Sequence, residues 1–291
     1  MTAQATAGRV KTSTNVREVL LEGLGLAVRG LGMVSPNLAS AVLLKVFCSP
    51  QRLVKAGWGK VPAPDASAFE FEGERLAVYR FGPAHNGKTV LVVHGWNGRS
   101  EQFRTLIEPL RNEGFGVVAF DQAGHGKSTG RQANVPRFSR AIAAVAAHVG
   151  GLDSIVAHSL GSVASAHAIA QGLKVRRLVM VAPSGNPSLF IKNTLKDYRF
   201  SDSLGALMTQ RLERQEAIVV NDFDRERLAP KLGAPLLVIH DTGDREVDFR
   251  EGQAWAQAAS QSRLIEMQGL GHNRILASPK THEAIAEFLR A

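Results

Sequence analysis

Short runs of continuously apolar residues constrain the fold of this chain more than any other feature. Five of them read TVLVVH, GVVAF, SIVAH, RLVMVA and PLLVIH. A strand with one face in water alternates apolar and polar residues, whereas a strand buried on both faces is apolar throughout. These runs therefore predict strands of a mostly parallel sheet that helices cover on both faces.

The segments between the runs have helical character. We expect strands at residues 68–72, 75–81, 89–94, 116–121, 153–158, 176–182, 235–240 and 262–268, and helices at 100–113, 136–149, 160–172, 249–259 and 279–290. Alternation of strands and helices is typical of a doubly wound α/β sheet, here with eight strands. The first two strands lie in FEFEGERLAVYRF, whose Glu-Gly-Glu turn predicts an antiparallel hairpin at the sheet edge.

One long insertion interrupts this alternation. Residues 184–233 separate the sixth and seventh strands, and a single crossover helix needs fewer residues than that. The helical pattern of residues 201–220 predicts a small helical cap above the carboxyl edge of the sheet, where ligands bind in such folds. We assign residues 67–291 to one α/β domain that includes this cap.

The N-terminal part of the chain precedes that domain. Residues 1–15 are small and polar, which predicts a disordered tail, and residues 16–66 form a helical extension. We expect three helical pieces within residues 16–57, because Ser35-Pro36 and Ser49-Pro50 each place proline directly after an N-cap serine. The first piece has one apolar face, formed by Leu20, Leu24, Ala27 and Leu31.

Composition excludes several other classes of protein. Of the 291 residues, 44% are hydrophobic and 21% are charged, as in an ordinary soluble globular protein. Cys48 is the only cysteine, which excludes an intrachain disulfide and a cysteine-rich zinc site and fits a reducing compartment. There is no secretory signal pattern, and Glu22, Arg29 and Pro36 interrupt the most apolar stretch. We therefore expect a cytoplasmic protein.

The charge balance bears on binding partners. Lys and Arg number 35 against 26 Asp and Glu, giving a net charge of +9, but the basic residues are scattered and form no patch with aromatic residues. This pattern predicts no nucleic-acid partner. The apolar N-terminal helices also carry Arg29, Lys45, Arg52 and Lys55, which permits peripheral contact with a membrane interface. Packing as an extra layer on the domain and contact with a second subunit stay open, and so does the oligomeric state.

Three serines stand in a Ser-x-Gly pattern, which is part of the motif of a serine nucleophile. That motif needs a strand before the serine, a helix after it, and small residues two positions away on each side. Ser128 matches the pattern G-x-S-x-G literally, but no strand leads directly into it, so we interpret it as a loop residue. Ser203 lies within the expected cap.

Ser159 is the serine with the right surroundings. The predicted strand DSIVAH precedes it and the predicted helix SVASAHAIAQG follows it. Gly161 supplies one of the small neighbours, and Ala157 replaces the usual glycine with one extra methyl group. We predict that Ser159 is the nucleophile, although an N-cap serine without chemistry would fit the same pattern.

Taken together, these motifs resemble the α/β-hydrolases over residues 67–291. That family places its acid after the seventh strand and its histidine after the eighth, which correspond here to HDTGDREVD and GLGHNRI. The resemblance implies Asp244 as the acid and His272 as the base, with Asp241 and Asp248 as rivals for the acid.

Two further loops extend the resemblance. His94-Gly95-Trp96 follows the third strand and resembles the loop that holds an oxyanion, which implies the backbone amides of Trp96 and Leu160 as donors. The segment DQAGHGKS at residues 121–128 resembles a structural turn of the family, so His125 is not expected to be catalytic. Trp96 could line the pocket or pack under the cap, and Arg99 could attract an anionic group or point into solvent.

The resemblance implies two-step acyl transfer by a Ser-His-Asp triad. We expect no cofactor and no metal, because the chain has neither an H-E-x-x-H motif nor a glycine-rich dinucleotide fingerprint. The 121–128 turn and the short cap resemble monoacylglycerol lipase and lysophospholipase relatives, which favours a small-molecule carboxylic ester of small, medium or lipid-like acyl group. A peptidase or amidase of the serine-aminopeptidase type and a non-catalytic ligand-binding protein are the alternatives.

Overall fold

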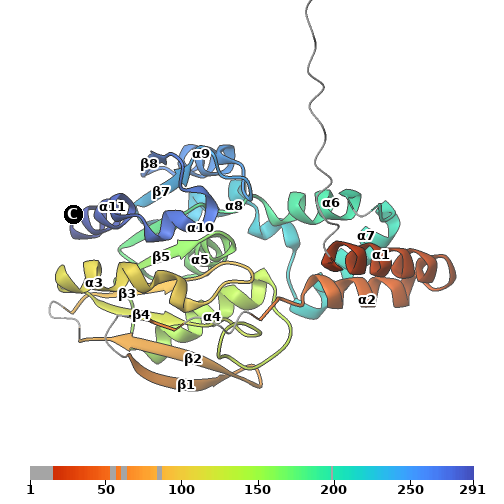
Figure 1. The fold of residues 1–291 in the computed structure, drawn as a ribbon, viewed down its shortest axis with the longest axis horizontal. Coiled ribbons are helices and arrows are strands. Elements are labelled where there is room, and N and C mark those ends of the chain that lie inside the picture. The colour runs from red at the N-terminus through yellow and green to blue at the C-terminus, as the bar shows by residue number, and fades with distance from the viewer. Residues whose placement is uncertain (1–15, 53–56, 60–63, 84–86, 198) are drawn as a thin grey trace, which may run out of the picture.

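A computed structural model describes residues 16–52, 57–59, 64–83, 87–197 and 199–291 (Figure 1). Its centre is one eight-stranded sheet with the strand order β1-β2-β4-β3-β5-β6-β7-β8. The strands are β1 (Asp65–Phe71), β2 (Glu74–Phe81), β3 (Thr89–Val93), β4 (Gly116–Phe120), β5 (Ser154–His158), β6 (Arg177–Val181), β7 (Leu236–Asp241) and β8 (Ser262–Met267). All neighbours from β4 to β8 pair in parallel. The predicted mostly parallel sheet is therefore confirmed.

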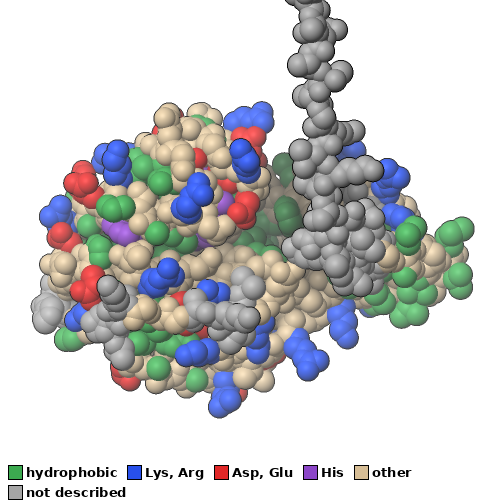
Figure 2. Space-filling view, viewed as in Figure 1, with side chains coloured by type: hydrophobic (Ala, Val, Ile, Leu, Met, Phe, Trp, Pro, Cys, Tyr) green, Lys and Arg blue, Asp and Glu red, His purple; other side chains and the backbone are tan. Residues whose placement is uncertain are grey.

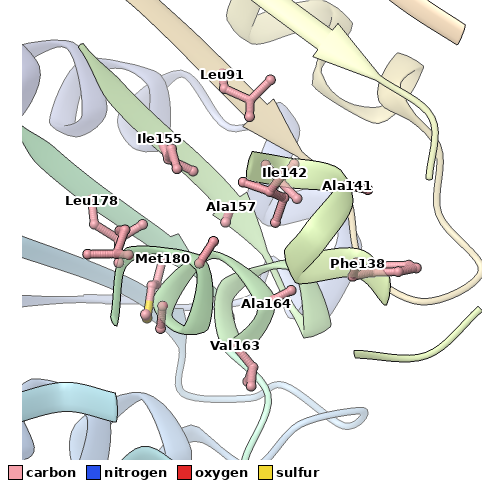
Figure 3. Packing of buried hydrophobic residues seen from close by; sticks show 14 of the residues in the cluster. Leu91, Phe138, Ala141, Ile142, Ile155, Ala157, Val163, Ala164, Leu178 and Met180 are labelled. Carbon is pink, nitrogen blue, oxygen red and sulfur yellow. The ribbon is translucent and has the colours of Figure 1, made fainter. Parts of the chain in front are cut away.

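Helices cover both faces of this sheet. One face carries α4 (Val135–His148), α5 (Leu160–Ala170) and α9 (Phe249–Ala258), and the other carries α3 (Arg104–Asn112) and α11 (Pro279–Arg290). Apolar side chains of the strands fill the space beneath them; Figure 3 shows Leu91 and Ile155 of the sheet on the side of Ile142 of α4, in the same cluster. This double cover explains why the inner strands are apolar throughout.

The predicted edge hairpin is present. β1 pairs antiparallel with β2, and β2 pairs antiparallel with β4. Glu72 and Gly73 form its two-residue loop, with φ of +49° and +76°. Positive φ at both positions gives the turn type whose twist matches that of the paired strands, and glycine at the second position adopts it without strain.

The insertion between β6 and β7 is helical, as predicted. It comprises α6 (Pro187–Asp197), α7 (Asp202–Glu216), α8 (Arg225–Leu228) and the short 3₁₀ helices η2 (Val220–Phe223) and η3 (Ala229–Lys231). Ser201 caps α7, because its hydroxyl accepts a hydrogen bond from the Leu204 amide at 3.3 Å. Ser203 lies exposed on the first turn of this helix.

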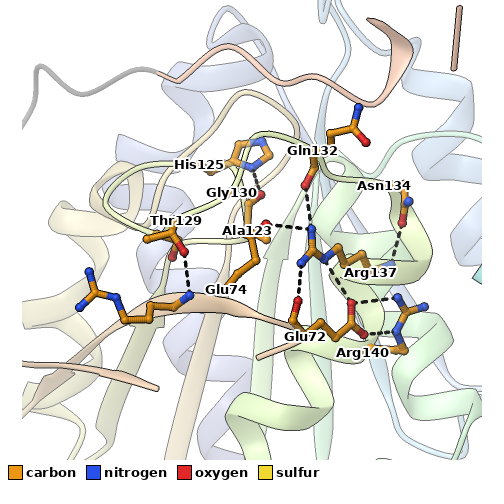
Figure 4. A network of polar contacts seen from close by, with 12 residues as sticks. Glu72, Glu74, Ala123, His125, Thr129, Gly130, Gln132, Asn134, Arg137 and Arg140 are labelled. Carbon is orange, nitrogen blue, oxygen red and sulfur yellow. Dashed lines mark hydrogen bonds and ion pairs between the residues drawn. The ribbon is translucent and has the colours of Figure 1, made fainter. Parts of the chain in front are cut away.

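An ion-pair network ties this cap to the body of the protein. Glu72, in the edge hairpin, accepts hydrogen bonds from Arg137 and Arg140 of α4 (Figure 4). Arg140 also pairs with Glu216 at the end of α7, 2.8 Å away. The hydrogen bond from Arg140 lowers the pKa of the Glu72 carboxyl. The edge hairpin and the cap are thus both tied to α4, through Arg140.

The N-terminal residues form two helices, α1 (Val16–Val34) and α2 (Pro36–Phe47), with proline at the start of α2 as predicted. The third helix was expected to begin at Ser49-Pro50, and it does not begin there. α2 ends at Phe47 with Cys48 as its C-cap, the Ser49 hydroxyl donates to the Lys45 carbonyl at 2.6 Å, and residues 49–52 are not helical. Residues 53–56, where the rest of that helix was expected, and the tail 1–15 lie outside the described residues.

The buried face of α1 also differs from the prediction. Ala27 is exposed and Leu31 only half-buried, whereas Val28 is buried; the side chains of Leu20 and Leu24 lie outside the described part. Gly32 faces α2 and α7: a Cβ there would make ordinary van der Waals contact, at 3.8 Å, with Ala39 and with Leu204. The spacing of the large apolar residues in α1 could not predict that Val28 is buried and Ala27 is exposed.

The two N-terminal helices share an apolar core with the cap, not with the sheet. Val28, Leu43 and Leu44 pack in one cluster with cap residues that include Leu204, Met208 and Leu212. Below α2, the Cys48 carbonyl accepts from the Ala133 amide at 2.8 Å, and Arg52 donates to the carbonyls of Ser128 and Gly130. No described helix is long and apolar enough to cross a membrane.

Candidate active site

Ser159 occupies a sharp turn between β5 and α5. β5 ends at His158, α5 begins at Leu160, and the serine between them has φ +51° and ψ −124°. Positive φ is unfavourable for a residue with a side chain and typically costs about 1–3 kcal/mol, so the surrounding structure must hold it. The serine is half-buried at the carboxyl edge of the sheet.

The helix side of this turn has no room for a side chain. A Cβ on Gly161 would lie 2.6 Å from the His94 carbonyl oxygen and 2.9 Å from that of Val93. Both are backbone atoms at the end of β3 and cannot rotate away. On the strand side, Ala157 is fully buried, and its methyl group packs in the core. The sequence thus departs from the two-glycine pattern only where the fold accepts a methyl group.

Asp244 and His272 lie together at the same edge of the sheet. Asp244 follows β7, His272 lies in the short helix α10 (Gly271–Arg274), and His272 Nδ1 is 2.7 Å from Asp244 Oδ2. Asp244 is buried, and its Oδ1 accepts hydrogen bonds from the amides of Glu246 and Val247 at 2.8 and 3.0 Å. Burial acts to raise the pKa of this carboxyl, but the hydrogen bonds from the amides and the imidazole outweigh it and lower the pKa.

The turn at Ser159 adjoins this pair through His158. His158 Nε2 donates to the His272 carbonyl at 2.9 Å, and the two rings lie 4.6 Å apart between centroids. Among the described residues, no hydrogen bond joins Ser159 Oγ to His272. The structure therefore places the three predicted residues at one edge of the sheet, with Asp244 and His272 in direct contact.

A second histidine, which the sequence analysis missed, contacts the same carboxylate. His240 Nε2 lies 3.2 Å from Asp244 Oδ2 and 3.2 Å from the Val247 carbonyl, so this nitrogen is assigned as the protonated donor. Its Nδ1 lies against the backbone of Gly252, where an added Cβ would be 2.5 Å away. The motif HDTGD begins with this histidine, but only its aspartates were considered.

The rival acids have other partners. Asp241 is buried and accepts from the amides of Gly243 and Leu270 at 2.9 and 2.7 Å, which fixes the loops after β7 and β8. Asp248 caps α9 and pairs with Arg250 at the surface. Neither contacts His272 among the described hydrogen bonds.

The loop after β3 lies directly against Ser159. A Cβ on Gly95 would be 2.8 Å from the Ser159 Cβ. The Gly95 carbonyl is held from the other side, by His94 Nδ1 at 2.7 Å and by the Gly98 amide at 3.1 Å. In a trans peptide the C=O and the N–H point in opposite directions, so the Trp96 N–H points away from those two partners.

The Leu160 amide is oriented in the same way. The carbonyl of the Ser159–Leu160 peptide accepts from the Ser162 amide at 2.9 Å and from the Ser184 amide at 3.4 Å. Leu160 is the first residue of α5, and the first amides of a helix have no intrahelical acceptor. Among the described residues, neither the Trp96 nor the Leu160 amide donates a hydrogen bond. Both are available to a bound group.

The turn at residues 121–128 supports this loop and contains no free nucleophile. His125 donates from Nδ1 to the Ala123 carbonyl at 3.0 Å and accepts at Nε2 from the Asn97 amide at 3.2 Å, as expected for a structural residue. Ser128 is fully buried; its hydroxyl donates to the Asp121 carbonyl and accepts from the Ala77 amide. Ser128 thus matches G-x-S-x-G only because a turn needs glycines at these positions, and its hydroxyl is bonded to backbone groups.

Trp96 and Arg99 have partners within the protein. Trp96 is half-buried and packs edge-on against His125, with ring centroids 5.6 Å apart. Arg99 pairs with the buried Glu101 at 2.8 Å, and its side chain is 18% exposed, so the expectation of a solvated arginine is wrong. The described residues contain no group of three or more His, Cys, Asp or Glu side chains arranged to hold a metal ion.

Comparison with known proteins agrees with this architecture. A family model described as serine aminopeptidase, S33, matches residues 84–214. A search of curated protein sequences found no match.

Solved structures of hydrolases share the fold. A membrane phospholipase A, described as a bacterial virulence factor, is 18% identical with a TM-score of 0.62, over 95% of this chain and 98% of its own. Monoacylglycerol lipase from Paleococcus ferrophilus is 23% identical with a TM-score of 0.57, over 74% of this chain and 98% of its own. A predicted CIB-like hydrolase from Thermoplasma acidophilum is 18% identical with a TM-score of 0.61, over 78% and 98%. The chain therefore has the α/β-hydrolase fold.

The contacts at Gly161 predict a loss of stability when a methyl group is added there. Gly161→Ala should lower the free energy of unfolding by about 1–3 kcal/mol, because the new Cβ meets two fixed carbonyl oxygens. Gly23→Ala is the matched control: this glycine is also helical, has open space around its Cα, and should gain up to about 1 kcal/mol of helix stability. Urea denaturation measures both. Equal effects of the two variants would contradict the packing described.

The buried histidines predict a pH dependence of stability. Burial lowers the pKa of His125 and of His158 from 6.5 to about 3. Between these values the unfolded chain binds more protons than the folded one, so the free energy of unfolding falls as the pH is lowered from about 6.5 toward 3. Each histidine should contribute about 1.4 kcal/mol per pH unit.

Urea denaturation at several pH values measures this slope. His125→Gln and His158→Gln, prepared separately, should each reduce it by about 1.4 kcal/mol per pH unit. If both variants fold and keep the wild-type slope, the two imidazoles do not remain neutral in the folded protein.

Proposed function

We propose that this protein is a serine hydrolase that cleaves carboxylic esters, with Ser159 as nucleophile, His272 as general base and Asp244 as its acidic partner. The observation that carries the proposal is the 2.7 Å contact between His272 Nδ1 and Asp244 Oδ2 beside the strained turn at Ser159. A serine hydroxyl is a weak nucleophile, and an adjacent imidazole oriented by a carboxylate is the usual means of activating it.

The polarity of that contact determines the direction of proton transfer. Asp244 accepts from Nδ1, so Nε2 of His272 is the nitrogen that takes the Ser159 proton as Oγ attacks the ester carbonyl. Asp244 then stabilises the imidazolium. The imidazolium gives its proton to the leaving alcohol, and water activated by the same histidine cleaves the acyl-enzyme. The lowered pKa of Asp244 keeps the carboxylate ionised for this role.

The amides of Trp96 and Leu160 are the proposed oxyanion donors. Their peptide carbonyls are fixed by other partners, which turns both N–H groups away from those contacts. Donors that are oriented before the reaction stabilise the developing charge without reorganisation, and losing one typically costs about 2.7–4 kcal/mol of the barrier. In this account His94 is a positioning residue, because it holds the Gly95 carbonyl.

The choice of esters rests on relatives and on the setting of the site. The similar structures include a monoacylglycerol lipase, a phospholipase A and Est1E from Butyrivibrio proteoclasticus with bound ferulic acid. The face in Figure 2 is hollowed between the α/β body and the N-terminal helices, and apolar side chains lie in the hollow, which suits an apolar acyl group. The family-model match favours a second candidate, a serine aminopeptidase.

Steady-state kinetics test the proposal. Ser159→Ala should lose p-nitrophenyl ester hydrolysis by a factor of at least about 10⁴, because the variant lacks the hydroxyl that attacks the ester in the proposed mechanism. Ser128→Ala is the control, and a folded preparation should retain turnover because this hydroxyl is buried in the turn. Wild-type activity of pure Ser159→Ala would overturn the nucleophile assignment. Faster cleavage of an aminoacyl anilide than of the matched ester would favour the peptidase.

A further inference from the structure

Exposed large apolar side chains are concentrated in one part of the described protein. There are eight of them, and all lie in the N-terminal helices or the cap: Leu26, Met33, Val34, Leu38, Val46, Leu189, Phe190 and Val219. None lies on the described part of the α/β body outside the cap. Exposed apolar groups scattered singly need no explanation, but their confinement to one region marks an interaction surface.

The two most exposed of these residues are at the end of α1, where Met33 is 89% and Val34 86% exposed; Leu38, in the first turn of α2, is 54% exposed. Figure 2 shows apolar side chains at the end of the N-terminal helices that lies farthest from the sheet. We name this surface, formed by Met33, Val34 and Leu38, the hairpin tip. It projects away from the core that α1 and α2 share with the cap.

The apolar surface extends from the tip along the helices. Leu38, Val42 and Val46 recur every fourth residue on one side of α2, with Val42 half-buried. At the other end of α2, Phe47 contacts Phe190 of α6 with ring centroids 6.0 Å apart, and Phe190 is 62% exposed. The surface therefore continues from the hairpin onto the cap helix.

Basic side chains predominate near this surface. No aspartate or glutamate occurs between Glu22 and Asp65, and the described parts of α1 and α2 carry Arg29 and Lys45. On α6, Lys192 and Lys196 are exposed; the acids nearby are Asp197, at the end of this helix, and Asp202, at the start of α7. Helices with exposed apolar residues and basic neighbours lie in the interface of anionic bilayers. A second copy of the chain would bring these like charges together.

We propose that the hairpin tip and the adjoining side of α6 bind the surface of an anionic lipid bilayer. The apolar side chains of the tip enter the boundary between headgroups and acyl chains, and the lysines contact the headgroup phosphates. α6 follows β6, whose end adjoins Ser159 through the contact of the Ser184 amide with the Ser159 carbonyl. Of the surface proposed to bind lipid, α6 thus lies on the chain segment that follows directly from the site.

Vesicle sedimentation tests this surface in the Ser159→Ala background, so that the lipids are not consumed. The protein should bind phosphatidylcholine vesicles that contain phosphatidylglycerol, and bind pure phosphatidylcholine more weakly. Adding Met33→Glu and Val34→Glu should weaken binding by at least about tenfold, because two exposed apolar groups and the charge match are lost together.

Val219→Glu is the matched control. Val219 is also exposed, at 51%, but it lines a different hollow with Glu213 and Asp222, and its substitution should leave vesicle binding unchanged. In the wild-type background, the tip variant should keep its turnover of a soluble ester, which separates this proposal from the proposed function.

Three results would overturn the proposal: no binding to either vesicle, equal binding by the tip variant, or a tip-dependent dimer in sedimentation velocity without vesicle binding. The last would assign the surface to a second copy of the chain.

Discussion

The turn at Ser159 is the constraint on which the rest of the site depends. A residue with a side chain holds φ at +51° only if its surroundings leave it no better choice. β5 fixes the turn on one side through its pairing with β3 and β6, and α5 fixes it on the other by packing Gly161 against backbone oxygens of residues 93 and 94. The loop that carries Trp96 reaches Ser159 because residue 95 is also glycine. One short segment therefore sets the position of the serine and of both proposed donor amides.

Neutral histidines hold the surrounding loops in place. His94, His125 and His158 are buried, each donates to a backbone carbonyl, and the first two also accept a backbone amide. Burial lowers the pKa of each ring, so each keeps both a donor and an acceptor nitrogen at neutral pH. A carboxylate or an amine could not satisfy such a pair of backbone partners. His272 differs from these three because it has a carboxylate partner, and it is the proposed base.

Much of the fold and of the site could be predicted from the sequence, because both depend on local patterns. Continuously apolar runs marked β3 to β7 with ends within one or two residues of those observed, and the Glu72-Gly73 turn marked the hairpin. Ser159 was preferred to Ser128 because a strand and a helix flank it. The proposed catalytic roles rest on the family resemblance together with this geometry.

The parts that could not be predicted depend on packing between distant segments. The buried face of α1 is set by the packing of Val28 with α2 and the cap, and Arg99 pairs with Glu101 because the fold brings the two side chains together in a largely buried position. His240 approaches Asp244 because the loop after β7 folds back and because Gly252 leaves room for its ring. The spacing of residues along the sequence gives no sign of these contacts. The same holds for the shared core of the N-terminal helices and the cap.

The central claim is that Ser159 is an activated nucleophile, and covalent labelling tests it most directly. The wild-type protein is treated with a fluorophosphonate, digested, and the adduct is located by tandem mass spectrometry. The account predicts a single adduct on Ser159 and none in His272→Ala, whose serine lacks its base. An adduct on Ser128 or Ser203, or a folded wild-type protein that takes up no label, would contradict it.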